Sequence, residues 1–218
     1  MKRYPIPAQE TRAEIKVKNS LFIATAAPVF SVDEAKEFIA RIKAEFSDAS
    51  HNVPAYSVGF GPSVIAHCSD DGEPSGTAGR PILAVLQGSG LGDLAIVVTR
   101  YFGGTKLGTG GLVRAYGDAA KAVLEALPRA EKVPTHTAMV VIPYNYLERI
   151  RLLVVAHNGH ILDEAFAADI TVTMQFIVED FPAFQAALEE MSHATLAAEI
   201  VETNEETIMP LGSVFGEP

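Results

Sequence analysis

One stretch limits the possible folds of this chain more than any other, because it joins an apolar strand directly to a strongly patterned helix. The run LAIVV at residues 94–98 is apolar at every position, which is typical of a strand in a buried, central place. Downstream, apolar side chains recur at helical spacing and form one stripe, at Leu112, Ala115, Tyr116, Ala119, Ala120, Val123, Leu124 and Leu127. We therefore expect a central strand followed by a helix with one buried face.

Between these elements lies RYFGGTKLGTGGLVRAYG, residues 100–117, with six glycines. Thr109 is in place to cap a helix whose first turn holds Gly110 and Gly111, where several N–H groups have no intrahelical partner. Gly103 and Gly104 allow the preceding turn to approach a ligand without a Cβ in the way. These features predict an anion-binding or phosphate-binding loop. The alternative is a tight strand-to-helix connection whose glycines serve packing alone.

Cationic side chains accompany this loop, yet it matches no named nucleotide motif. Lys106 lies inside the loop rather than after its last glycine, so no P-loop is present, and Val113 stands where a dinucleotide fingerprint needs its third glycine. The predicted phosphate or nucleic-acid contacts are Arg100, Gly103, Gly104, Lys106, Gly108, Thr109, Gly110, Gly111 and Arg114.

A second loop, SDDGEPSGTAG at residues 69–79, places three carboxylates within four positions. Such oxygens could hold Mg²⁺ or act in acid–base chemistry, or they could pair with arginines or cap the turn at Gly72. No His or Cys stands in a set arrangement with them, so we assign no catalytic residue, no metal ligand and no cofactor. We interpret the segment as a supporting loop for the glycine-rich one, through Asp70, Asp71, Glu73, Ser75, Thr77 and Arg80.

Charge is distributed unevenly along the 218 residues. Residues 1–130 carry 14 Lys and Arg against 13 Asp and Glu, whereas residues 131–218 carry 3 against 14. A nucleic-acid partner is therefore expected only for the first half. No apolar run is long enough to span a membrane, and the first residues lack the apolar core of a signal peptide, so we expect a cytoplasmic protein. The single cysteine, Cys68, excludes an internal disulfide.

Strand and helix patterns divide the chain into two domains. In the first, residues 1–130, we expect two strands that meet near Asn19, a helix opened by Ser31 and Glu34 at capping-box spacing, paired strands at 55–60 and 63–68, and a short helix at 82–87. PRAEKVP at 128–134 has the composition of a linker. Residues 134–205 are predicted to follow the order β-α-β-β-α-β of a ferredoxin-like domain. Residues 206–218 are expected to form a flexible tail.

The two loops together resemble the signature of the YigZ/IMPACT family in its two-domain bacterial type: SDDGEPSGTAGRPIL is followed by VVTRYFGGTKLGTGGLVRAYG. The resemblance implies an α+β protein. Its N-terminal domain would have the two-layer α/β fold shared by the second domain of a small-subunit ribosomal protein and the GHMP kinases. Its ferredoxin-like C-terminal domain would resemble the last domain of elongation factor G.

This resemblance also implies a role near translation, and it supplies no catalytic residues. Eukaryotic relatives regulate activation of a starvation-responsive kinase but lack this C-terminal domain, so that mechanism is not transferred. Relatives often have His-x-Cys where this chain reads HNVPAY, so no thiol or metal role is carried over to His51.

Our leading hypothesis is a non-enzymatic protein that contacts RNA or the ribosome through its first domain and modulates translation. A protein partner for the second domain is possible under this hypothesis. One alternative is an enzyme or binding protein for a small phosphorylated or nucleotide ligand at the glycine-rich loop. A second alternative is a protein-interaction scaffold that uses the exposed sheet of the second domain.

Overall fold

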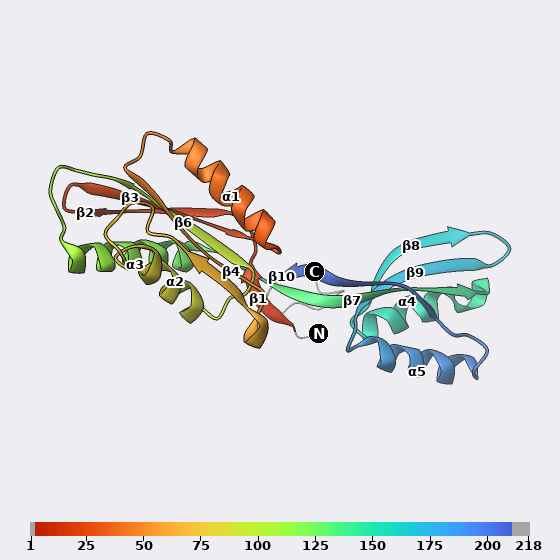
Figure 1. Cartoon of the computed structure of the whole chain (residues 1–218). Helices are drawn as coiled ribbons and strands as arrows, with labels where there is room; N and C mark the ends of the chain where they lie inside the picture. The colour runs from red at the N-terminus through yellow and green to blue at the C-terminus, as the bar shows by residue number, and fades with distance from the viewer. Residues whose placement is uncertain (1–2, 211–218) are drawn as a thin grey trace. The chain divides into compact units, whose positions relative to one another are not determined.

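A computed structural model describes residues 3–210 of the chain (Figure 1). The chain divides into two compact units, one comprising Tyr4–Glu131 and the other beginning at Lys132. Each unit has its own antiparallel sheet and its own helices, which confirms the expected α+β class.

The first unit is built on a five-stranded antiparallel sheet. Its order is β2-β3-β6-β4-β5, so the apolar run at 94–98 lies in the central strand, as its composition predicts. The two strands expected to meet near Asn19 are β2 and β3, and a 3₁₀ turn at Gly61–Ser63 joins β4 to β5. The bounds are Thr11–Val17 for β2, Ser20–Pro28 for β3, His51–Val58 for β4, Ile65–Cys68 for β5 and Leu94–Tyr101 for β6.

Helices cover this sheet on both faces (Figure 1). Helices α2 (Gly79–Gly88) and α3 (Thr109–Ala126) share the larger core with one face, and the predicted apolar stripe of α3 supplies much of it. Helix α1 (Val32–Glu45) packs Ala35, Phe38 and Ile42 on the other face. This unit therefore has one layer more than the two expected.

The start of α1 follows the expected capping box. Ser31 has extended backbone, and its hydroxyl accepts a hydrogen bond from the N–H of Glu34 at 3.1 Å. The Glu34 carboxylate in turn accepts from the N–H of Phe30 at 2.9 Å. Two N–H groups at the helix end are thus satisfied by side chains.

The second unit has the predicted β-α-β-β-α-β order. Strand β7 lies between β9 and β10, and β8 borders β9, which is the strand order of a ferredoxin-like sheet. Strand β1 (Tyr4–Pro7), which was not predicted, belongs to the first unit and pairs with β7, whose first residues lie in the same unit. The elements are β7 (Arg129–Ile142), a 3₁₀ turn (Tyr144–Tyr146), α4 (Leu147–Ala156), β8 (His160–Phe166), β9 (Ile170–Ile177), α5 (Phe181–Ser192) and β10 (Glu199–Pro210).

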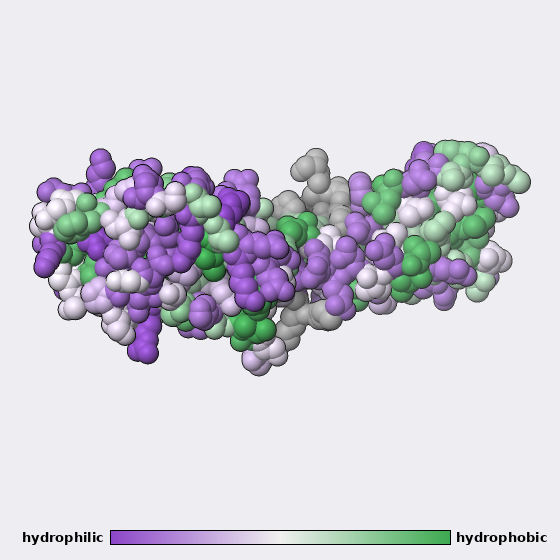
Figure 2. Space-filling view, turned by 45° about the horizontal axis from the view of Figure 1, so that its top comes forward, coloured by the Kyte–Doolittle hydropathy of each residue, from purple (hydrophilic) through white to green (hydrophobic). Residues whose placement is uncertain are grey.

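Helices α4 and α5 pack on one face of the second sheet, and the other face is open (Figure 1). Met139 and Val141 of β7 point to the open face and are exposed, because their neighbours Ala138, Val140 and Ile142 are buried against the helices. Figure 2 shows hydrophobic residues gathered on the surface of this unit. Among the helices of residues 3–210, none has the length and apolar content to cross a membrane.

Two expectations drawn from local composition are wrong. The predicted linker at 128–134 is part of β7 from Arg129 onward, and Val133 and Thr135 are fully buried in it. The predicted flexible tail begins inside a strand, because residues 206–210 are the end of β10, which pairs with β7; residues 211–218 lie outside the described part. Sheet pairing between distant segments orders both stretches, and local composition does not report such pairing.

The pairing of β7 predicts where a protease cuts the native protein. Trypsin should cleave after Lys106, in an exposed loop, well before it cleaves after Arg129 or Lys132, since the latter two lie in a paired strand and Lys132 bonds Glu206 at 3.2 Å. Mass spectrometry of a timed digest measures the order of cleavage. The control is the urea-unfolded chain, in which all three sites should be cut. Early cleavage of the native protein after residue 129 or 132 would contradict the prediction and support the interpretation of residues 128–134 as a linker.

Candidate phosphate-binding site

The glycine-rich connection consists of residues 102–108, between the end of β6 and the start of α3. Its last residue, Gly108, is the N-cap of α3 and has φ +75°, a conformation that side-chain-bearing residues seldom adopt. The prediction that Thr109 caps the helix is therefore wrong, because Thr109 is the first helical residue and no side chain caps this end. The first intrahelical bond runs from the N–H of Leu112 to the carbonyl of Gly108 at 2.9 Å. The N–H groups of residues 109–111 precede that bond and point out of the helix end.

The glycines of this connection and of the first turn of α3 differ in whether, and why, the structure requires a glycine at their positions. A Cβ on Gly103 would lie 1.8 Å from the carbonyl oxygen of Asn19, so this glycine permits a close approach of two backbone segments. Gly104 has φ +79°, which the turn requires. A Cβ on Gly110 would meet nothing within 4 Å, so packing does not require a glycine there. The packing-only alternative thus accounts for Gly103 but not for the helix start.

Arg100 does not lie on the surface with the other predicted phosphate contacts. Its side chain is 6% exposed, and Nη1 donates to Glu73 Oε1 at 2.5 Å. The same carboxylate oxygen accepts from the hydroxyl of buried Tyr116 at 2.8 Å. The guanidinium also lies between the rings of Phe22 and Phe102, each 5.5 Å away. One buried cluster therefore joins the carboxylate loop, β6 and α3.

Tyr116 is held in its neutral form by this cluster. Desolvation by burial is the largest cause that raises the pKa of its hydroxyl, and the hydrogen bond to Glu73 raises the pKa further. Because the hydroxyl remains protonated, it acts as a donor to Glu73 throughout the ordinary pH range.

Asp70 organises the start of α2. Its carboxylate accepts hydrogen bonds from the N–H groups of Gly76, Ala78 and Gly79 at 2.7, 3.1 and 2.9 Å. Desolvation raises the pKa of this carboxyl, but the three N–H donors and nearby Arg80 outweigh it and lower the pKa overall. Asp70 is thus a structural carboxylate at a helix start.

Asp71 connects the same loop to β4 and α1. Its carboxylate accepts from the N–H of Asn52 at 2.7 Å and from Lys43 Nζ at 2.5 Å. Its carbonyl accepts a hydrogen bond from Nδ1 of His51 at 2.8 Å. All three carboxylates of the loop therefore have partners, in line with the structural-pairing interpretation.

The other residues of the supporting loop have smaller roles. The Thr77 hydroxyl donates to the carbonyl of Pro74 at 2.7 Å, while Ser75 and Arg80 are exposed. In the part of the chain that the structure describes, no three His, Cys, Asp or Glu side chains are grouped to hold a metal ion.

A pocket of about 400 Å³ lies beside the start of α3. It brings together four of the predicted contacts, Arg100, Lys106, Gly108 and Thr109, whereas Arg114 lies on an exposed part of α3 outside it.

Sequence reasoning missed three further members of the site, which are Tyr116 in the buried cluster and His51 and Phe102 in the pocket. The register of β4 on β6 places His51 opposite Arg100, a pairing that no local pattern shows. The pocket is lined by His51, Glu73, Pro74, Arg100, Phe102, Lys106, Leu107, Gly108, Thr109 and Leu112.

Comparison with known proteins shows which family contains these two loops. Residues 18–124 match the Impact N-terminal domain, and residues 140–195 match a domain of unknown function, DUF1949. The IMPACT family member YigZ of Escherichia coli is 36% identical over 93% of this chain and 100% of its own length. The chain belongs to the IMPACT family. The resemblance seen in the sequence is thereby confirmed.

One further IMPACT relative and one solved structure show how far the likeness extends. YvyE of Bacillus subtilis is 51% identical over 52% of this chain and 51% of its own length. The crystal structure of a hypothetical protein, 35% identical, aligns with a TM-score of 0.60 over 93% of this chain and 98% of that chain. Both units of the fold therefore occur together in a solved structure.

The buried cluster leads to a prediction about stability. Glu73→Gln should lower the free energy of unfolding by about 3 kcal/mol, because Arg100 is left as a buried charge without a counter-charge. Adding Arg100→Met should recover part of this loss, since the uncompensated charge is then removed. Urea unfolding measures both. The control Glu45→Gln breaks an exposed pair with Arg12 and should change stability little; an equal loss in both single variants would contradict the prediction.

The lowered pKa of Asp70 predicts a pH dependence. A carboxyl whose folded-state pKa lies below its unfolded value of about 3.9 contributes stability above that value and loses it as the pH falls through the folded pKa. Asp70→Ala should therefore be less stable than the parent by about 2 kcal/mol at neutral pH, the worth of hydrogen bonds to a charged group. The difference should shrink below about pH 4. Thermal unfolding across a pH series tests this, and a pH-independent difference would show that the charge of Asp70 is not responsible.

Proposed function

We propose that this IMPACT-family protein is a non-enzymatic, RNA-associated or ribosome-associated protein that modulates translation. In this proposal residues 102–114 contact phosphates of RNA. The observation that carries it is the uncapped start of α3, where three N–H groups lie beside the exposed side chain of Lys106. Such a helix end attracts anions through its dipole and its free donors.

Translation enters the proposal through the family, because the resemblance implies that its eukaryotic members regulate activation of a starvation-responsive kinase. The charge distribution supports a phosphate partner for the first unit only, since residues 131–218 carry 14 acidic against 3 basic residues. A protein partner for the second unit fits the exposed apolar side chains of its open sheet face, among them Met139 and Val141.

Engagement of the carboxylates favours binding over catalysis. A general base or metal ligand needs a carboxylate that is free to meet substrate or ion. Asp70 holds the start of α2, Asp71 holds β4, and Glu73 is shared by Arg100 and Tyr116. These roles leave no carboxylate of the loop uncommitted.

One alternative is supported by a specific observation. The pocket of about 400 Å³ has the size of a small-ligand site, and Phe102, 48% exposed, offers a ring beside the phosphate-attracting helix end. A small phosphorylated compound or a nucleotide is therefore the second candidate ligand. It shares the phosphate chemistry of the first and differs in the length of the molecule that carries the phosphate.

Binding measured across a salt series tests the leading proposal. With Arg100 committed to Glu73, Lys106 and Arg114 are the exposed cations of the segment. Two phosphate contacts predict a log–log slope of affinity against salt of roughly −1.5 to −2. Lys106→Ala should weaken binding to every RNA sequence alike and change the slope by about one unit. Fluorescence anisotropy with single-stranded RNA and co-sedimentation with ribosomes are the two measurements.

Lys36→Ala is the matched control. Lys36 is an exposed lysine of α1, on the opposite face of the sheet, so its removal changes the net charge equally but leaves the candidate site untouched. If both lysine variants lose affinity to the same degree, binding reflects total charge and not this loop. If the parent binds neither RNA nor ribosomes, the glycines of the loop serve packing and the proposal fails.

A further inference from the structure

The pocket beside α3 combines hydrogen-bond donors from three parts of the fold. Arg100 comes from the end of β6, Lys106 from the glycine-rich loop, and the N–H group of Thr109 from the first turn of α3. Its acidic member, Glu73, already bonds Arg100 and Tyr116. The pocket therefore presents donors and positive charge to whatever enters it.

The start of α3 is open as well as uncapped. Gly108 has no side chain, and a Cβ on either Gly108 or Gly110 would meet nothing within 4 Å. A Cβ on Gly111, by contrast, would lie 3.1 Å from Cβ of Leu107, so the open space lies at Gly108 and Gly110, on either side of the N–H group of Thr109.

Arg100 supplies a second, independent observation. Its side chain is more than nine-tenths buried and lines the pocket, yet its Nε–H group has no hydrogen-bond acceptor among the described residues. Nη2 makes only a 3.5 Å contact with the hydroxyl of Ser20. Buried arginine donors without an acceptor are uncommon, and this one belongs to a side chain that lines the pocket.

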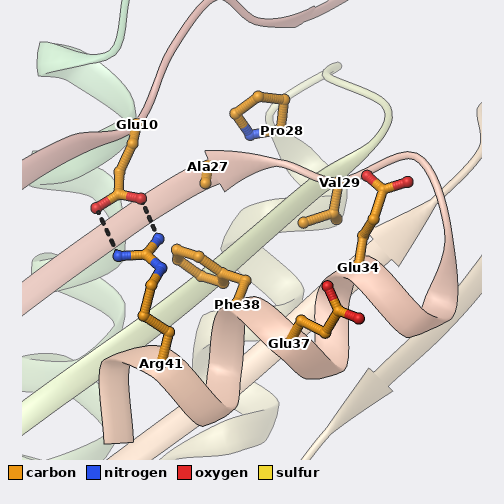
Figure 3. Close-up of a pocket in the computed structure, with 8 residues that line it drawn as sticks. All are labelled: Glu10, Ala27, Pro28, Val29, Glu34, Glu37, Phe38 and Arg41. Atoms are coloured by element: carbon orange, nitrogen blue, oxygen red, sulfur yellow. Dashed lines mark hydrogen bonds and ion pairs between the residues drawn. The ribbon is translucent and has the colours of Figure 1, made fainter. Parts of the chain in front are cut away.

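Another hollow of the first unit has the wrong charge for such a ligand. It measures about 450 Å³ and lies between α1 and the sheet (Figure 3). Its cation, Arg41, faces the carboxylate of Glu10, while Glu34 and Glu37 add two further carboxylates. An anion would be repelled there, so this hollow does not compete with the pocket beside α3 for a phosphate.

From these observations we propose that the pocket binds a terminal phosphate, a phosphomonoester, and that its source is the 5′ end of a single-stranded RNA. The inference rests on the proposed function and specifies which phosphate the loop recognises. A terminal phosphate offers three unesterified oxygens and up to two charges to donors that converge from three directions. An internal phosphodiester offers two such oxygens and one charge, and its chain must continue on both sides through a pocket of small-ligand size.

Phe102 fits the first base of such an RNA. Its ring is 48% exposed and lines the same pocket. Stacking of a base on an aromatic ring is favourable for every base, so recognition of a 5′ end by this arrangement does not require a particular sequence. The Arg100 guanidinium lies 5.5 Å from the ring centroid, within the range of a cation–π interaction.

The test compares two RNAs that differ only at the 5′ end. A short single-stranded RNA labelled at its 3′ end is prepared with a 5′-phosphate and with a 5′-hydroxyl, and the affinity of each is measured by anisotropy. We expect the phosphorylated form to bind at least about tenfold more tightly, the effect of one to two charge-assisted hydrogen bonds. Phe102→Leu should lower the affinity for both RNAs to the same degree, because it removes the stacking surface but leaves the phosphate donors.

A matched pair of variants tests the helix end itself. Thr109→Pro removes one free N–H at the first helical position, where proline is tolerated, and should reduce the preference for the 5′-phosphate several-fold. Thr109→Ala removes the hydroxyl but retains the N–H, and should preserve the preference. Circular dichroism checks that both are folded. A preference unchanged in Thr109→Pro would overturn the inference.

The remaining outcomes separate this inference from the proposed function. Equal affinity for the two RNAs would overturn the terminal-phosphate pocket and leave RNA binding by the loop in place. A nucleoside 5′-monophosphate that competes as well as the phosphorylated RNA would assign the pocket to a free nucleotide and overturn the RNA source. Failure of every probe to bind would overturn both.

Discussion

The buried contact between Glu73 and Arg100 is the interaction on which the candidate site depends. Arg100 is the penultimate residue of β6, and Tyr116, the second donor to Glu73, lies about two turns into α3. The two donors thus stand on either side of the glycine-rich connection, and one carboxylate holds both. A charge pair this deeply buried contributes little net free energy to folding, but it holds β6 and α3 in place relative to each other.

The carboxylate loop, residues 69–79, holds Glu73 in position for that contact. Asp70 fixes the loop to the start of α2 and Asp71 fixes it to β4, so that Glu73 is presented to the interior from a rigid support. The loop contains carboxylates because only they accept several N–H bonds at once and also neutralise a buried arginine. The three carboxylates, interpreted from the sequence as a supporting loop, all have structural partners in the fold.

Local patterns predicted the parts of this fold that have local causes. The apolar stripe of α3, the capping box at Ser31 and the β-α-β-β-α-β order of the second unit all follow from spacing within one segment. Features with distant causes escaped: strand β7 where a linker was expected, the burial of Arg100, and His51 in the pocket. Each depends on which strand pairs with which. The cap at Gly108 escaped because its positive φ depends on the path of the whole loop.

Assigning Arg100 to the interior changes what kind of recognition the loop can perform. Two exposed cations, Lys106 and Arg114, give a weak and sequence-independent attraction to phosphate. In the proposed complex the remaining donors are the buried guanidinium of Arg100 and backbone N–H groups, whose positions the fold fixes with little loss of side-chain entropy on binding. Donors held in this way discriminate by geometry rather than by charge. Under the proposed function, a protein of net charge −10 would therefore select a phosphate group by its fit to the pocket beside α3.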